Sequence, residues 1–217
     1  MLRLFLSTII VLITIFIFGG CAKSQLTYTM PENIENIKIQ TTKEVIGDYN
    51  KIWSTLIRNL SDTSFSVNNI EKDSGFINIS FSSNNPNEFI DCGKWSGFFE
   101  NMQTKEIYNF DAADNANFLS LGDGVIRVNR VTELNGRINL SLQKIDNQKS
   151  MLKVNVRYVF TGKDYQTFLA YSYRNNISTW DITFDSKTIG KNKLGQTTCK
   201  SIGTLEKKLL SLVDEFN

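Results

Sequence analysis

The sequence predicts an α+β protein of two layers, in which an antiparallel sheet of about six to seven strands carries an N-terminal and a C-terminal helix on one face. Three observations support this prediction. Several segments alternate strictly between apolar and polar residues, which is typical of half-buried strands. An apolar stripe at helical spacing lies near each end of the chain, and turn-forming dipeptides separate alternating segments.

The first residues have the composition of an export signal. Arg3 is the only charge before an apolar run from Leu4 to Phe18. This run is shorter than the roughly 20 residues that a helix needs to span a bilayer. A basic start, a short apolar centre and small residues at its end indicate a secretory signal peptide, which we place at residues 1–20. The alternative is a single anchoring helix.

The end of this run, Phe18-Gly19-Gly20-Cys21, resembles the lipobox of bacterial lipoproteins. The resemblance implies that the signal is cleaved before Cys21 and that this cysteine carries lipid. Two or more acyl chains anchor a protein stably, whereas one chain binds only marginally. We therefore expect a lipidated Cys21 and a tether over residues 21–34, followed by a single α+β domain over residues 35–217.

Two further cysteines, Cys92 and Cys199, form an even pair once Cys21 is lipidated. In an oxidising compartment this arithmetic predicts a disulfide. The bridge would close a loop on the order of 100 residues, for which chain-entropy estimates give about 4–5 kcal/mol. Buried free thiols and a metal pair are the alternatives, although a zinc site would lack ligands in a chain without histidine.

The two helical stripes come first and last in the domain. The first consists of Val45, Tyr49, Ile52, Leu56 and Leu60, and the second of Ile202, Leu205, Leu209, Leu212, Val213 and Phe216. Such stripes more often cover a sheet than bind a partner, so we place both helices on the sheet.

The strands lie between these helices. Alternating apolar positions are Ile77, Ile79 and Phe81, then Ile138, Leu140 and Leu142, then Leu152 to Phe160, and finally Trp180, Ile182 and Phe184. Asp123-Gly124 and Asn135-Gly136 are strong hairpin signals, and "DNQKS" at residues 146–150 is a looser one. Residues 82–117 read as a long loop, which indicates a function or a small hidden element.

The composition argues against an enzyme and against nucleic-acid binding. The chain has no histidine, which excludes serine–histidine and cysteine–histidine catalysis and leaves an enzyme that uses acidic residues as the least favoured alternative. Its formal net charge of only +2 gives no electrostatic reason to expect a nucleic-acid partner. We therefore predict no catalytic residues, no cofactor and no metal.

Two clusters leave alternatives open. Asp111, Asp114, Asn115 and Asn117 lie close in sequence and could bind calcium, but they lack the spacing of an EF-hand loop, so a solvated loop is the preferred interpretation. Tyr165, Tyr171 and Tyr173 share one strand face and could line a ligand groove. A place in the core, with hydroxyls at its rim, is preferred.

The segment from Val45 to Phe81, with its Trp-bearing helix and two strands meeting at "KDSG", resembles the helix-grip modules of the BamC family of outer-membrane assembly lipoproteins. The resemblance implies a non-catalytic accessory or scaffold subunit of an envelope assembly. We expect a lipid anchor in the bacterial outer membrane, a domain facing the periplasm, and other envelope proteins as partners. The alternative function is carriage of a lipid or a peptidoglycan fragment between helix and sheet.

Overall fold

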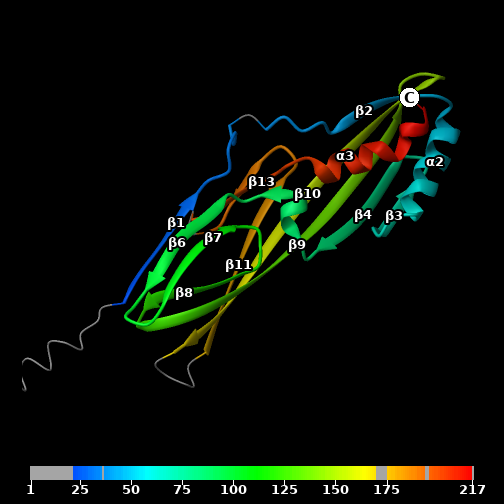
Figure 1. Ribbon diagram of the computed structural model, residues 1–217. Coiled ribbons are helices and arrows are strands. Elements are labelled where there is room, and N and C mark those ends of the chain that lie inside the picture. Colours follow the sequence, from blue (N-terminus) through cyan, green and yellow to red (C-terminus); the bar gives the residue numbers. More distant parts are fainter. Residues whose placement is uncertain (1–21, 36, 170–174, 194–195, 217) are drawn as a thin grey trace, which may run out of the picture.

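A computed structural model describes residues 22–35, 37–169, 175–193 and 196–216 (Figure 1). Its strands are β1 (Lys23–Thr29), β2 (Thr42–Ile46), β3 (Ser66–Glu71), β4 (Phe76–Ser83), β5 (Ile90–Asp91), β6 (Lys94–Glu100), β7 (Lys105–Asp111), β8 (Ala116–Gly122), β9 (Gly124–Lys144), β10 (Lys149–Phe168), β11 (Asn175–Asp185), β12 (Ile189–Lys191) and β13 (Thr198–Ser201). Its helices are α2 (Tyr49–Ser61) and α3 (Thr204–Leu210), with short 3-10 helices η1 (Pro86–Glu88) and η2 (Ser211–Phe216).

A long hairpin of β9 and β10 runs through the whole molecule (Figure 1). Its register is continuous from Lys144 opposite Ser150 to Ile126 opposite Phe168. On one edge β4 and β8 pair with successive parts of β9, and on the other edge β2 and β11 pair with successive parts of β10. With β3 outside β4, these strands form a seven-stranded antiparallel sheet. The predicted antiparallel sheet with few helices is therefore confirmed.

The alternation of side chains assigns the two faces of this sheet. Even-numbered residues of the central part of β9 and β10 point inwards, and Leu134, Ile138, Val154 and Phe160 among them are almost completely buried. Odd-numbered residues of β9 point outwards and are exposed from Arg127 to Asn139. This pattern of period two leaves a polar outer face opposite the core.

The helices cover the inner face at one end of the hairpin. Asp48 caps α2, because its carboxylate accepts hydrogen bonds from the backbone amides of Asn50 and Lys51 at 3.0 and 3.1 Å. The buried side of α2 joins α3, η2 and the sheet in one apolar cluster. The amide of Asn59 also donates to the Leu212 carbonyl at 2.8 Å, which joins α2 to η2.

Two smaller sheets lie beside the large one. The first has the order β1-β6-β7 and forms a second apolar cluster with β8 and β9 around Phe99, Tyr108 and Phe118. The second has the order β12-β13-β5 and contributes Cys199 to the larger cluster. The molecule therefore has one apolar cluster under the helices and another at the opposite end of the hairpin.

Three expectations about local structure are wrong. The expected tether contains β1, which pairs with β6 from Lys23 opposite Glu100 onwards. Residues 82–117, read as a loop, contain η1 and the strands β5, β6 and β7 and enter β8. Asn135-Gly136 lies inside β9, where the Phe81 ring covers Gly136 so closely that an added Cβ would lie 1.9 Å from it. The close contact with this ring, which leaves no room for a side chain, explains why residue 136 is glycine better than a turn does.

Candidate functional site

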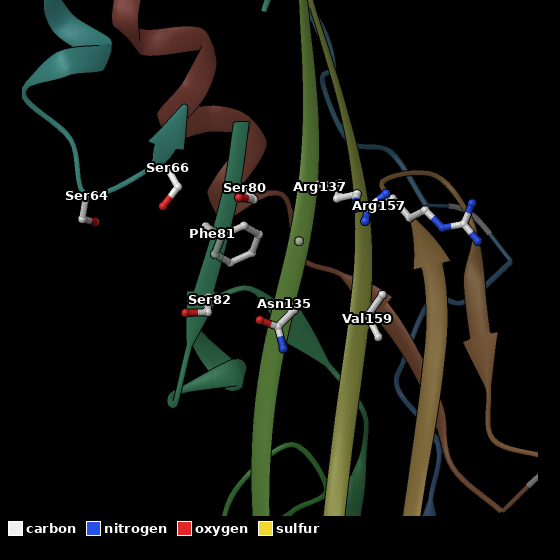
Figure 2. Close-up of a pocket in the computed structure, with 10 residues that line it drawn as sticks. Ser64, Ser66, Ser80, Phe81, Ser82, Asn135, Arg137, Arg157 and Val159 are labelled. Atoms are coloured by element: carbon white, nitrogen blue, oxygen red, sulfur yellow. The ribbon is translucent and has the colours of Figure 1, made fainter. Parts of the chain in front are cut away.

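The outer face of the large sheet carries an open groove of about 870 Å³ between β3 and β10. We call it the serine–arginine groove. Its polar lining consists of Ser64, Ser66, Ser80, Ser82, Asn135, Arg137 and Arg157. Figure 2 shows the serines on one side of the groove and the two arginines on the other. The groove thus has hydroxyl groups along one side and two arginines on the other, with the Arg157 side chain extending away from the serines (Figure 2).

The register of the sheet places these side chains in one row. Ser66 lies opposite Ser80, Ser80 opposite Arg137, and Arg137 opposite Arg157. All four side chains project from the outer face, because paired residues in an antiparallel sheet share a face. The row therefore depends on β3, β4, β9 and β10 together.

The two arginines are the unusual part of this row. Like charges directly opposite each other on an antiparallel pair are destabilising. Among the described residues, neither Arg137 nor Arg157 forms an ion pair or a side-chain hydrogen bond. Asp185 is the register partner of Arg157 on β11, but it does not come within ion-pair distance. The groove thus holds two positive charges to which no acidic side chain of the described residues is bound.

Arg130, on the inner face of the same strand, shows the opposite arrangement. Its guanidinium binds Asp164 through two hydrogen bonds of 2.7 and 2.9 Å. It also lies over the rings of Phe118 and Trp180, with its central carbon 5.7 and 5.4 Å from the two ring centres. Arg130 therefore has a structural role, whereas the donors of Arg137 and Arg157 face solvent.

The chemistry of the groove is that of anion binding. A guanidinium presents donors in a planar fork that matches a carboxylate or a phosphate. Serine hydroxyls can add hydrogen bonds to the same anion, and no side-chain hydrogen bond occupies Ser66 or Ser82 among the described residues. The polar lining of the groove contains no carboxylate or imidazole that could act as a general base for these serines.

The predicted disulfide is confirmed. Cys92 follows β5 and Cys199 lies on β13, and their sulfurs are bonded at 2.01 Å. Both residues are buried in the larger apolar cluster. The adjacent strands support the link, since Lys200 on β13 pairs with Asp91 on β5. The bridge thus joins the start of the β1-β6-β7 sheet to the strand that precedes α3.

The acidic cluster does not assemble into a cation site. The side-chain oxygen of Asn115 accepts a hydrogen bond from the Thr132 amide at 2.7 Å, and Asp114 accepts one from Asn87 at 2.6 Å. Burial, and secondly the nearby charge of Asp111, raise the pKa of the Asp114 carboxyl. In the described part of the chain, no group of three or more acidic, cysteine or histidine residues is placed to hold a metal ion.

The remaining predicted residues fall outside any common site. Tyr165 lies on the outer face of β10 with 42% of its surface exposed, so its expected place in the core is wrong. Tyr171 and Tyr173 lie outside the described residues, as do Cys21 and the signal peptide. Lipidation of Cys21 stays a prediction. Over the residues that the structure covers, no helix is both long and apolar enough to cross a membrane.

Sequence reasoning missed the pairing of Arg137 with Arg157. A signal was present, because a hairpin turning at "DNQKS" brings these two positions opposite each other. Comparison with known proteins adds no functional assignment, since no family model, curated protein or solved structure matches the chain.

Proposed function

We propose that this chain is an envelope lipoprotein, anchored through lipid on Cys21 and facing the periplasm from the bacterial outer membrane. In this proposal it acts as a non-catalytic accessory or scaffold subunit, and the serine–arginine groove binds an acidic segment of a partner protein. The observation that supports the groove as the docking surface is the cross-strand pair Arg137 and Arg157, neither of which forms an ion pair within the described part of the chain.

The electrostatic argument has two steps. Arg137 and Arg157 lie directly opposite each other on paired strands. Like charges in such a pair repel each other, so this arrangement is destabilising in the free protein. A carboxylate that binds between them would remove this repulsion and form charge-assisted hydrogen bonds. The groove therefore favours binding of a protein segment with acidic side chains over contact with water in the free protein.

The alternative, carriage of a lipid or peptidoglycan fragment between helix and sheet, has less support. The space under the helices is occupied by the side chains of Ile52, Leu56, Leu205 and Leu209, all of which are fully buried. A ligand there would have to displace core residues, and each such displacement is costly in a close-packed interior.

Cross-linking in intact cells tests the proposal. A photo-reactive amino acid replaces Ser82, which is exposed in the groove, and the captured species are identified by mass spectrometry. We expect an envelope protein to be captured, and we expect the double variant Arg137→Glu/Arg157→Glu to abolish its capture. Arg127→Glu is the matched control, because Arg127 is exposed on the same face of β9 outside the groove.

Two outcomes would contradict the proposal. Capture of lipid or glycan alone would favour the carrier function. Capture of a protein that is equally efficient in the charge-reversed variant would show that Arg137 and Arg157 do not bind it.

A further inference from the structure

The chain enters the folded structure immediately after Cys21. Ala22 already packs against the smaller apolar cluster, to which Val125 and Ile126 of β9 also belong. Lys23 then begins β1 by pairing with Glu100. Almost no free chain therefore separates Cys21 from the end of the molecule where β1 starts. A lipid on Cys21 would hold this end against the bilayer surface.

Three exposed apolar side chains surround this point. Met102 lies in the turn that follows Glu100 and is 72% exposed. Leu121 lies at the end of β8 opposite Val125 and is 38% exposed. Leu169 donates its backbone amide to the Val125 carbonyl at 2.9 Å and is 50% exposed. We call Met102, Leu121 and Leu169, together with Ala22, the anchor end.

We infer that the anchor end is a membrane-contact surface, with Met102, Leu121 and Leu169 lying in the headgroup region of the bilayer. The inference rests on the proposed lipidation of Cys21. Apolar side chains at the boundary between headgroups and acyl chains gain from burial there. They add contacts to the lipid anchor and fix the orientation of the domain as well as its attachment.

This orientation sets the distance of the serine–arginine groove from the bilayer surface. The long hairpin starts at the anchor end, and the helices lie at the opposite end (Figure 1). At about 3.3 Å per residue, the stretch of β9 from Gly124 to Arg137 spans about 40 Å. The paired strands and the Arg130–Asp164 ion pair stiffen this stretch. The groove is thus held away from the lipid, where a partner protein can reach it.

Quenching of tryptophan fluorescence by brominated lipids tests the inference. The full chain is produced in a bacterium that acylates lipoproteins and is reconstituted into phosphatidylethanolamine–phosphatidylglycerol vesicles with brominated acyl chains. Met102→Trp places a probe at the anchor end. Ile70→Trp is the control, because Ile70 is an apolar residue with 43% of its surface exposed near the helix end of the sheet. The wild-type chain supplies the background of its own tryptophans.

We expect brominated lipid to quench the added fluorescence of Met102→Trp and to leave that of Ile70→Trp unchanged. The mass of Cys21 is measured on the same sample, so that the two proposals are judged separately. An acylated Cys21 with an unquenched Met102→Trp would overturn the membrane contact and leave the anchor intact. Equal quenching at both positions would show a molecule lying flat and would also overturn it. An unmodified Cys21 would refute both.

Discussion

Replacing Tyr158 by phenylalanine should destabilise the protein through a single buried carboxylate. The Tyr158 hydroxyl donates to Glu206 at 2.9 Å, and both residues are fully buried. Among the described residues, Ser201 is the other side-chain donor to Glu206, at 3.2 Å from each carboxylate oxygen. The three residues join β10, β13 and α3. Loss of the hydroxyl leaves the carboxylate dependent on Ser201.

The size of the effect follows from the charge of the acceptor. A hydrogen bond to a charged group contributes about 1.5–3 kcal/mol, so Tyr158→Phe should lower the free energy of unfolding by about 2 kcal/mol. For a chain of this size, that corresponds to a fall in Tm of about 4–8 °C. Urea unfolding followed by tryptophan fluorescence measures the change directly.

The matched control is Tyr165→Phe, since Tyr165 lies exposed on the outer face of the same strand. It should change stability by less than about 0.5 kcal/mol. A double variant that also replaces Glu206 with leucine should lose less than the sum of the two single variants, because it removes the carboxylate that has lost its Tyr158 donor. A Tyr158→Phe variant as stable as the wild type would refute this reasoning.

The same residue predicts an alkaline dependence of stability. Burial, and secondly the charge of Glu206, raise the pKa of the Tyr158 hydroxyl well above its ordinary value. A raised folded-state pKa contributes stability that is complete below about pH 10, the pKa of an unfolded tyrosine, and is lost at higher pH. The urea midpoint of the wild type should therefore fall above about pH 10, and that of Tyr158→Phe should fall less.

Three further predictions concern other parts of the molecule. Cys199→Ser breaks the disulfide and should lower the free energy of unfolding by about 2–5 kcal/mol, measured by urea unfolding beside the reduced wild type. Arg157→Gln removes the repulsion in the groove and should stabilise the free protein by about 0.2–1 kcal/mol, whereas Arg127→Gln should not; a loss of stability would contradict the electrostatic argument. Gly162→Ala places a Cβ 2.1 Å from the Trp180 ring and should cost about 1–3 kcal/mol in thermal unfolding; an unchanged Tm would show that the ring moves freely.

The sequence alone determined the features that depend on the pattern of neighbouring residues or on composition. Alternation assigned the inner and outer faces of β10, because successive side chains of a strand point to opposite sides whatever the sheet around them. Ile52, Leu56 and Leu60 of the first predicted stripe likewise lie on the buried side of α2, whereas Val45 precedes the helix on β2. The pairing of Cys92 with Cys199 followed from counting the cysteines.

Other features were misread because local signals compete with distant contacts. Asn135-Gly136 has the composition of a hairpin turn. In the structure, however, Gly136 lies within a strand and the Phe81 ring of the neighbouring strand packs directly against it. In β6, Phe98 and Phe99 obscure the alternation, so the strand became visible only through its pairing with β1 and β7. The start of the domain was missed for the same reason, since β1 depends on β6 for its hydrogen bonds.

The serine–arginine groove belongs to the second kind of feature. Arg137 and Arg157 looked like ordinary surface charges in the sequence, and a predicted hairpin could at most have placed them opposite each other. Whether a charge is balanced depends on every strand that passes near it. Only the tertiary structure brought Ser66 and Ser80 into the same row. It also left Arg137 and Arg157 without an ion pair among the residues it describes, because electrostatic interactions act through space and not along the chain.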